Sequence, residues 1–174
     1  AHRHFRTGRR TQVRRNIAGI MTLPFPPVWV PFRLNLWIAA RLMPVFVKRR
    51  DLGAILADAT PQLQHQGRLK IGPGSIVESV KSAVSRPWRM KGRRCLREGL
   101  LGFYYLKLAG KHPLLRFGLL KGTLATSKPR AHCWIVLDNE IILNPPEGPM
   151  VHLFDYDGVT SIPASGTGNW SAQE

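Results

Sequence analysis

One cysteine and one histidine in this chain are placed as a thiol nucleophile and its proton acceptor would be. Cys95 opens a long apolar stretch that predicts a helix over residues 95–109. His132 lies near the start of the stretch 131–137, whose β-branched and aromatic content predicts a strand. A thiolate at a helix N-terminus, with an imidazole to take up and return its proton, is a nucleophile for acyl transfer. We therefore expect Cys95 and His132 to meet.

The residues around Cys95 favour an ionised thiol that faces substrate. A basic stretch precedes it, formed by Arg86, Arg89, Lys91, Arg93 and Arg94. Positive charge and the free N–H groups of a helix N-terminus both lower the pKa of a thiol, and the N–H groups near Leu96 could hold an oxyanion. Contacts to the substrate are expected from Arg93, Arg94, Trp88 and Trp134. The alternative is that Cys95 is a buried small hydrophobe, as isolated cysteines often are, behind a solvated basic linker.

A third side chain would have to orient the imidazole of His132, and Asp138 and Asn144 are the two candidates. If the turn between the strands has three residues (138–140), Trp134 pairs with Asn144, which then lies on the face of His132. A two-residue turn places Asn144 on the other face. Asp138 lies about 20 Å along the strand from His132, at about 3.3 Å per residue. We therefore expect Asn144 to orient His132, as an amide does in a Cys-His-Asn triad, and Asp138 to form the turn.

The second cysteine, Cys133, is assigned to packing, because side chains alternate along a strand and it then faces away from His132. The chain has only 2 cysteines, too few for a secreted disulfide scaffold, so we expect Cys95 to be a free thiol in a reducing cytoplasm. The remaining histidines show no metal-ligand spacing, and no glycine-rich phosphate loop is present. We predict neither a metal nor a cofactor.

Prolines, glycines and capping residues divide the first half of the chain. An amphipathic helix is predicted over 32–43, begun by Pro31 and ended by Pro44. A second short helix is predicted within 45–57, with Asp51 as its N-cap.

The third predicted helix follows a linker over 59–74 that is rich in proline and glycine. Ser75 is its expected N-cap, in a capping box with Glu78. Pro87 is expected to end it. Its apolar face consists of Ile76, Val77, Val80 and Val84.

The second half of the chain predicts one helix and then strands. The helix over 95–109 would be closed by Gly110 and Pro113. A strand is predicted within 114–126, and a β-hairpin over 131–144.

Composition restricts the partners. The chain has 174 residues, 44% of them hydrophobic, which suits one domain with an extension. Its 26 Lys and Arg outnumber 10 Asp and Glu, for a formal net charge of +16. This excess favours an acidic peptide, a nucleic acid or an anionic membrane surface. No recognised nucleic-acid motif accompanies it, so a nucleic-acid-binding role rests on charge alone. No stretch has the roughly 20 uncharged apolar residues of a transmembrane segment.

Two segments, 94–96 and 130–138, together resemble the transglutaminase-like proteins of lasso-peptide biosynthesis. These are the leader peptidases, also called the B protein or its C-terminal half. The family pattern is roughly Cys-Leu-x-Arg, a helix, a strand, then Ala-His-Ala-Trp-Val-Glu and a turn. The predicted upstream helices also resemble the family, so the resemblance covers about residues 30–150.

By matching position, the resemblance implies that Cys95, His132 and Asn144 form the family's catalytic triad. The chain departs from the pattern at three positions. Asn144 stands where the family usually has Asp, Glu98 stands where an arginine is expected, and Cys133 replaces the alanine that follows the histidine.

The predicted elements and the resemblance together imply an α+β fold of the papain/transglutaminase-like kind, with N-terminal helices and a central helix that carries the cysteine packed on an antiparallel sheet. They divide the chain into a basic disordered arm (1–20), an N-terminal helical part (21–72), a cysteine peptidase core (73–158) and a flexible C-terminal tail (159–174).

The function implied by the resemblance is that of a cytoplasmic cysteine peptidase. It would remove the leader from a ribosomally synthesised precursor peptide. A small leader-recognition protein and an ATP-dependent macrolactam cyclase would be its partners, with no nucleic acid. A transglutaminase-like acyl transfer at the same cysteine and histidine is the alternative.

Overall fold

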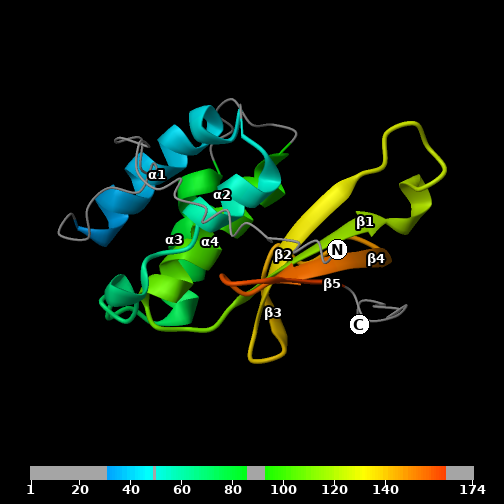
Figure 1. Ribbon diagram of the computed structural model, residues 1–174. Helices are drawn as coiled ribbons and strands as arrows, with labels where there is room; N and C mark the ends of the chain where they lie inside the picture. Colours follow the sequence, from blue (N-terminus) through cyan, green and yellow to red (C-terminus); the bar gives the residue numbers. More distant parts are fainter. Residues whose placement is uncertain (1–30, 49, 86–92, 164–174) are drawn as a thin grey trace, which may run out of the picture.

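The computed structural model describes residues 31–48, 50–85 and 93–163, and Figure 1 shows their arrangement. Within these ranges the helices are α1 (Phe32–Val47), α2 (Leu52–Asp58), α3 (Pro73–Val84) and α4 (Arg94–Leu108), with short 3₁₀ turns η1 (Leu63–His65) and η3 (Lys121–Thr123). The strands are β1 (Leu114–Leu120), β2 (Ala131–Leu137), β3 (Glu140–Leu143), β4 (Met150–Tyr156) and β5 (Ser161–Pro163). The expected α+β architecture is confirmed. The predicted arm (1–20), Pro87 and Trp88 lie outside the described residues.

The central helix α4 is buried between the other helices and the sheet (Figure 1). Every residue from Arg97 to Leu108 is buried, because the uncharged run 99–106 presents apolar side chains on all sides of the helix and needs neighbours on all sides. Its end is a left-handed glycine, Gly110, with φ 72°, and the Lys111 amide donates to the Leu106 carbonyl at 3.0 Å. This cap confirms the predicted end of the helix.

Two glycines on α4 allow the sheet to approach the helix closely. A Cβ on Gly102 would lie 2.6 Å from Leu143 Cδ2 and 2.7 Å from Ile135 Cδ1. A Cβ on Gly99, one turn nearer to Cys95, would lie 3.1 Å from Cys133 Sγ. The turns of α4 that follow Cys95 are therefore held against strands β2 and β3.

The five strands form one antiparallel sheet in the order β3-β2-β1-β4-β5. The turn between β2 and β3 has two residues, Asp138 and Asn139, with φ 52° and 68°. Left-handed residues at both central positions are the signature of a type I′ hairpin turn. Leu137 thus pairs with Glu140, so the three-residue turn considered above is wrong.

A β-bulge then shifts the hairpin register. Beyond the pair Val136–Ile141 the next pair is Ile135–Leu143, so Ile142 is an extra residue on β3. One extra residue reverses which face each later side chain occupies. Continued by one step past the end of β3, this register would set Asn144 opposite Trp134, which is the alignment that the three-residue turn would have produced.

The N-terminal helices differ from prediction in their bounds. The helix α1 continues through Pro44 to Val47, since Val47, three residues beyond the proline, still buries its apolar side chain. Asp51 caps α2 as predicted, accepting from the Ala54 amide at 2.8 Å.

Helix α3 starts at Pro73 instead of after Ser75, because a proline fits the first helical position, where no N–H is needed. The capping box predicted for Ser75 and Glu78 is therefore wrong, and Glu78 pairs with Lys81 instead. None of the described helices is long and apolar enough to cross a bilayer.

Strands β4 and β5 were not predicted. Residues 161–163, assigned above to a flexible tail, pair with β4. The polar residues His152 and Asp155 interrupt the apolar alternation of β4, because both belong to a cluster with Arg116 of β1.

Candidate active site

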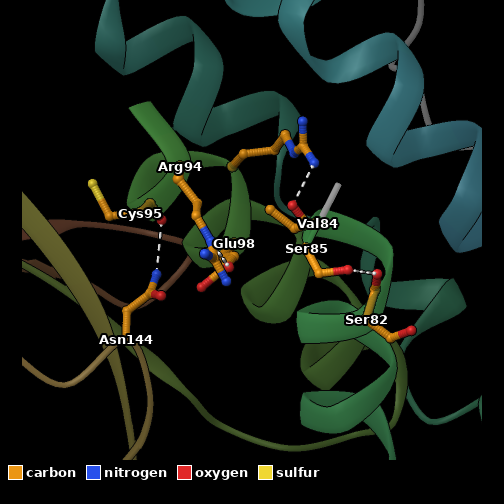
Figure 2. A network of polar contacts seen from close by, with 8 residues as sticks. Ser82, Val84, Ser85, Arg94, Cys95, Glu98 and Asn144 are labelled. Carbon is orange, nitrogen blue, oxygen red and sulfur yellow. Dashed lines mark hydrogen bonds and ion pairs between the residues drawn. The ribbon is translucent and has the colours of Figure 1, made fainter. Parts of the chain in front are cut away.

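Cys95 is the second residue of α4, and its side chain is half-buried. Arg93 occupies the N-cap, and no side chain caps the first turn. The first N–H groups of a helix have no intrahelical acceptor, so those near Leu96 stay available to an anion beside the sulfur. In Figure 2 the sulfur of Cys95 points away from the pair formed by Arg94 and Glu98.

The imidazole of His132 connects Cys95 to the end of the hairpin. The side chains of Cys95 and His132 interact closely enough that each shifts the pKa of the other, and Nε2 of His132 lies 3.0 Å from the main-chain carbonyl oxygen of Asn144. A carbonyl only accepts, so Nε2 carries a hydrogen, and Nδ1 is the ring nitrogen left for the thiol. The ring also stacks on Trp134, with centroids 6.1 Å apart. Two contacts thus fix its orientation and tautomer.

Asn144 lies at the site, but its side chain bonds to the Cys95 backbone and not to His132, which it was expected to orient. The amide nitrogen Nδ2 donates to the main-chain carbonyl of Cys95 at 2.9 Å, which Figure 2 shows. The contact to His132 comes from the main-chain carbonyl instead. Asn144 adopts φ 55°, a left-handed conformation that asparagine tolerates better than most residues. The backbone of Asn144 therefore orients the imidazole, and its side chain ties the hairpin to α4.

The contacts of Cys95 lower the pKa of its thiol to about 4. The largest cause is a hydrogen bond from Cys133; burial opposes the shift, and a hydrogen bond and positive charge from His132 reinforce it. The pKa of His132 is raised in turn, first by its hydrogen bond to Cys95, against burial, and then by the Asn144 carbonyl. These shifts favour a thiolate and an imidazolium, the charge state of an activated cysteine nucleophile.

Cys133 is the residue of the site that sequence reasoning missed. It does face away from the Trp134 side of the sheet, as alternation requires, and is only 2% exposed. The face that it occupies is the one covered by α4, so its sulfur reaches Cys95. The available signal was Gly99, one turn after Cys95, which permits a strand side chain beside the helix.

Of the other predicted site residues, Arg94, Arg93 and Leu96 have different surroundings. The guanidinium of Arg94 pairs with Glu98 at 2.7 Å, so the departure at Glu98 creates an ion pair within the helix. Arg93 is exposed and Leu96 packs partly against the core. Among the described residues, the causes that lower the Cys95 pKa are Cys133 and His132 rather than these arginines.

Trp134 is 2% exposed and packs with Val136 and Met150 on the sheet face opposite α4. Trp134 therefore packs against the His132 ring and, being buried, does not offer a surface to substrate.

No group of three or more histidine, cysteine or acidic side chains in the described parts of the chain could hold a metal ion. What the arrangement supplies is a half-buried thiolate, an oriented imidazole and helix N–H groups. These are the components of nucleophilic acyl transfer.

Comparison with known proteins gives one finding about the family. The model of the family described as "Transglutaminase-like superfamily" matches residues 30–151. This range includes α1 to β3 and therefore Cys95, His132 and Asn144. No curated protein and no solved structure matches the chain.

Proposed function

Because this chain belongs to the transglutaminase-like superfamily, whose members are generally cysteine-dependent enzymes, we propose that it is a cysteine peptidase that removes the leader from a ribosomally synthesised, lasso-type precursor peptide. The observation that supports this proposal most strongly is the contact between Cys95, at the start of α4, and His132, whose imidazole is oriented by the Asn144 carbonyl. The resemblance of the segments 94–96 and 130–138 to lasso-peptide leader peptidases supports the choice of substrate.

The reaction proceeds through a thioester. The Cys95 thiolate attacks the carbonyl carbon of the scissile amide, and N–H groups near Leu96 bind the oxygen of the tetrahedral intermediate. The His132 imidazolium protonates the leaving amine, the C–N bond breaks, and a thioester with Cys95 remains. His132, now neutral, removes a proton from water, which attacks the thioester. The acyl group leaves as a carboxylic acid, and Cys95 returns to the thiolate.

Precursor cleavage tests this proposal directly. The protein is incubated with lasso-type precursor peptides, alone and with a small leader-recognition protein, and the products are weighed by mass spectrometry. We expect two fragments whose masses add up to the mass of the intact precursor plus one water. With Cys95→Ala we expect no fragments. An intact precursor under every condition contradicts the proposal. Incorporation of a primary amine, without cleavage, favours transglutaminase-like acyl transfer at the same thiol.

The basic residues that precede Cys95 in the sequence suit an acidic leader. Arg93 is exposed beside the nucleophile and forms no ion pair with any residue that the structure describes, whereas the Arg94 guanidinium is paired with Glu98. We expect Arg93→Glu to weaken precursor binding and to flatten its salt dependence. Lys111→Glu makes the same charge change beyond the opposite end of α4 and serves as the control. If precursor affinity is the same in both variants and in the wild type, Arg93 does not bind the leader.

A further inference from the structure

The thiol of Cys133 is a buried reactive group that the proposed reaction does not use. Its sulfur faces α4 on the side of Cys95, and its interaction with Cys95 is the largest cause that lowers the pKa of that thiol. It also lies 3.1 Å from where a Cβ on Gly99 would sit. The absence of a side chain at Gly99, one turn after Cys95, therefore lets strand β2 bring a second sulfur against α4.

The environments of the two thiols decide which one ionises. Cys95 is half-buried and contacts the imidazole of His132, which can carry a positive charge. Cys133 is 2% exposed, and burial disfavours a charged thiolate. Its contact with Cys95 and its burial raise the pKa of Cys133 well above the ordinary value. The negative charge therefore belongs on Cys95, and the proton stays on Cys133.

We propose that Cys133 is a positioning residue whose S–H group donates a hydrogen bond to the Cys95 thiolate and stabilises it as the nucleophile. This inference rests on the proposed thiolate role of Cys95. Two donors, the His132 imidazolium and the Cys133 thiol, then hold the sulfur. No covalent bond to Cys133 is formed or broken at any step.

A hydrogen bond to a thiolate has two opposite effects on reactivity. It raises the fraction of thiolate at low pH, but it makes each thiolate less nucleophilic, because nucleophilicity falls as the thiol pKa falls. Loss of Cys133 should therefore slow Cys95 below its new pKa and accelerate it above. A residue that only fills space would produce no such crossing of the two pH profiles.

The test measures the rate of Cys95 alkylation by iodoacetamide against pH in the whole protein, for the wild type, three Cys133 variants and His132→Ala. Cys133→Ala and Cys133→Val remove the donor, and valine restores volume and suits a strand. Cys133→Ser keeps a donor. Trypsin would leave Cys95 in a tripeptide between Arg94 and Arg97, so chymotryptic peptides are used to assign the modified residue by mass.

We expect the midpoint for Cys95 to rise by about one pH unit or more in Cys133→Ala and Cys133→Val, a tenfold loss of thiolate at low pH. Above the new midpoint, these variants should react about threefold faster per unit of pKa increase. The midpoint of Cys133→Ser should stay closer to that of the wild type. Either donor-free variant suffices if the other does not fold.

The inference is overturned if all folded variants keep the wild-type midpoint and differ only in melting temperature. The measurement needs no peptide substrate, so it is separate from the precursor assay. If His132→Ala shifts the Cys95 midpoint and the Cys133 variants do not, the inference about Cys133 fails while the nucleophilic role of Cys95 stands. If no variant shifts it, both fail.

Discussion

The side chain of Asn144 donates a hydrogen bond to the main-chain carbonyl of Cys95 at 2.9 Å, and so joins the end of the β2–β3 hairpin to the first turn of α4. The main-chain carbonyl of the same residue accepts from Nε2 of His132 at 3.0 Å. Cys95 and His132 lie on different elements, and this one residue contacts both. Their relative position therefore depends on Asn144 through two separate groups.

The first prediction separates these two groups of Asn144. Asn144→Gly keeps the left-handed backbone, with φ 55°, and so keeps the carbonyl that holds His132. It removes only the amide, and we expect a loss of about 1 kcal/mol in unfolding free energy. Asn144→Ala also removes the amide, and adds a left-handed strain of about 1 kcal/mol. Urea unfolding measures both variants; equal stability of the two would contradict a role for the backbone conformation.

The second prediction concerns Asn144→Asp, which introduces the residue usual in the resembling family. A carboxylate cannot donate to the Cys95 carbonyl, and it would place negative charge beside a thiolate. We expect Asn144→Asp to raise the alkylation midpoint of Cys95, whereas Asn144→Gly leaves it nearly unchanged. A midpoint in Asn144→Asp at or below that of the wild type would show that the aspartate turns to His132 instead.

The third prediction is the pH dependence of the thiol itself. The pKa of Cys95 is about 4, and that of His132 lies above its ordinary 6.5. The Cys95 thiolate is therefore populated from just above pH 4, and the His132 imidazolium persists beyond pH 6.5. Between these limits the two charged groups coexist. Precursor cleavage should rise across the first value and fall as His132 loses its proton.

Removal of the imidazole tests this pair of charges. In His132→Ala the hydrogen bond and the positive charge beside Cys95 are lost, so the pKa of Cys95 should rise, and its alkylation at acidic pH should slow. Cys133 still contacts the thiol in this variant. An alkylation profile indifferent to His132 would show that the two residues form no functional pair.

The local sequence was sufficient to predict α4, its glycine cap and the β2–β3 hairpin. The helix is indicated by its apolar run, the cap by Gly110, and the hairpin by turn residues between two strand-like stretches. The register at Asn144 was not predictable in this way. It depends on a type I′ turn and on a bulge at Ile142. The bulge turns Leu143 toward α4, where it packs at Gly102, and a contact so distant in the sequence has no local signal. Cys133 was missed for a related reason, since alternation along a strand says which face a side chain occupies but not what covers that face.

The fourth prediction concerns the close approach of α4 to the sheet. In Gly102→Ala the new Cβ would lie 2.6 Å from Leu143 Cδ2, so neighbours must move, at a cost of about 1–3 kcal/mol. Gly74→Ala, in the first turn of α3, meets nothing within 4 Å and should be neutral or stabilising by about 0.5 kcal/mol. Urea unfolding of the two variants compares the same substitution in crowded and open surroundings. Similar stability of both variants would contradict the close approach.

The fifth prediction concerns the ion pair across β1 and β4. Arg116 makes two hydrogen bonds of 2.8 Å to the carboxylate of Asp155, and both side chains are 12% exposed. His152 also contacts this carboxylate, at 2.8 Å. We expect Arg116→Met to destabilise the protein by about 3 kcal/mol at neutral pH, because a nearly buried carboxylate loses its principal partner.

The loss of stability in Arg116→Met depends on pH in a direction that follows from the pKa of Asp155. Burial raises the pKa of Asp155, but Arg116 and His152 lower it further, so the net shift is downward. A carboxyl with a lowered folded-state pKa stabilises the fold above its unfolded pKa, and that contribution is lost as the pH falls through the folded value. The deficit of Arg116→Met relative to the wild type should therefore shrink as the pH falls through 3.8, the ordinary value for Asp155, and on toward its lower folded-state value, since a protonated carboxyl needs no cation. Urea unfolding at several pH values measures it. A deficit that is constant with pH would mean that Arg116 contributes through packing of its aliphatic chain rather than through its charge.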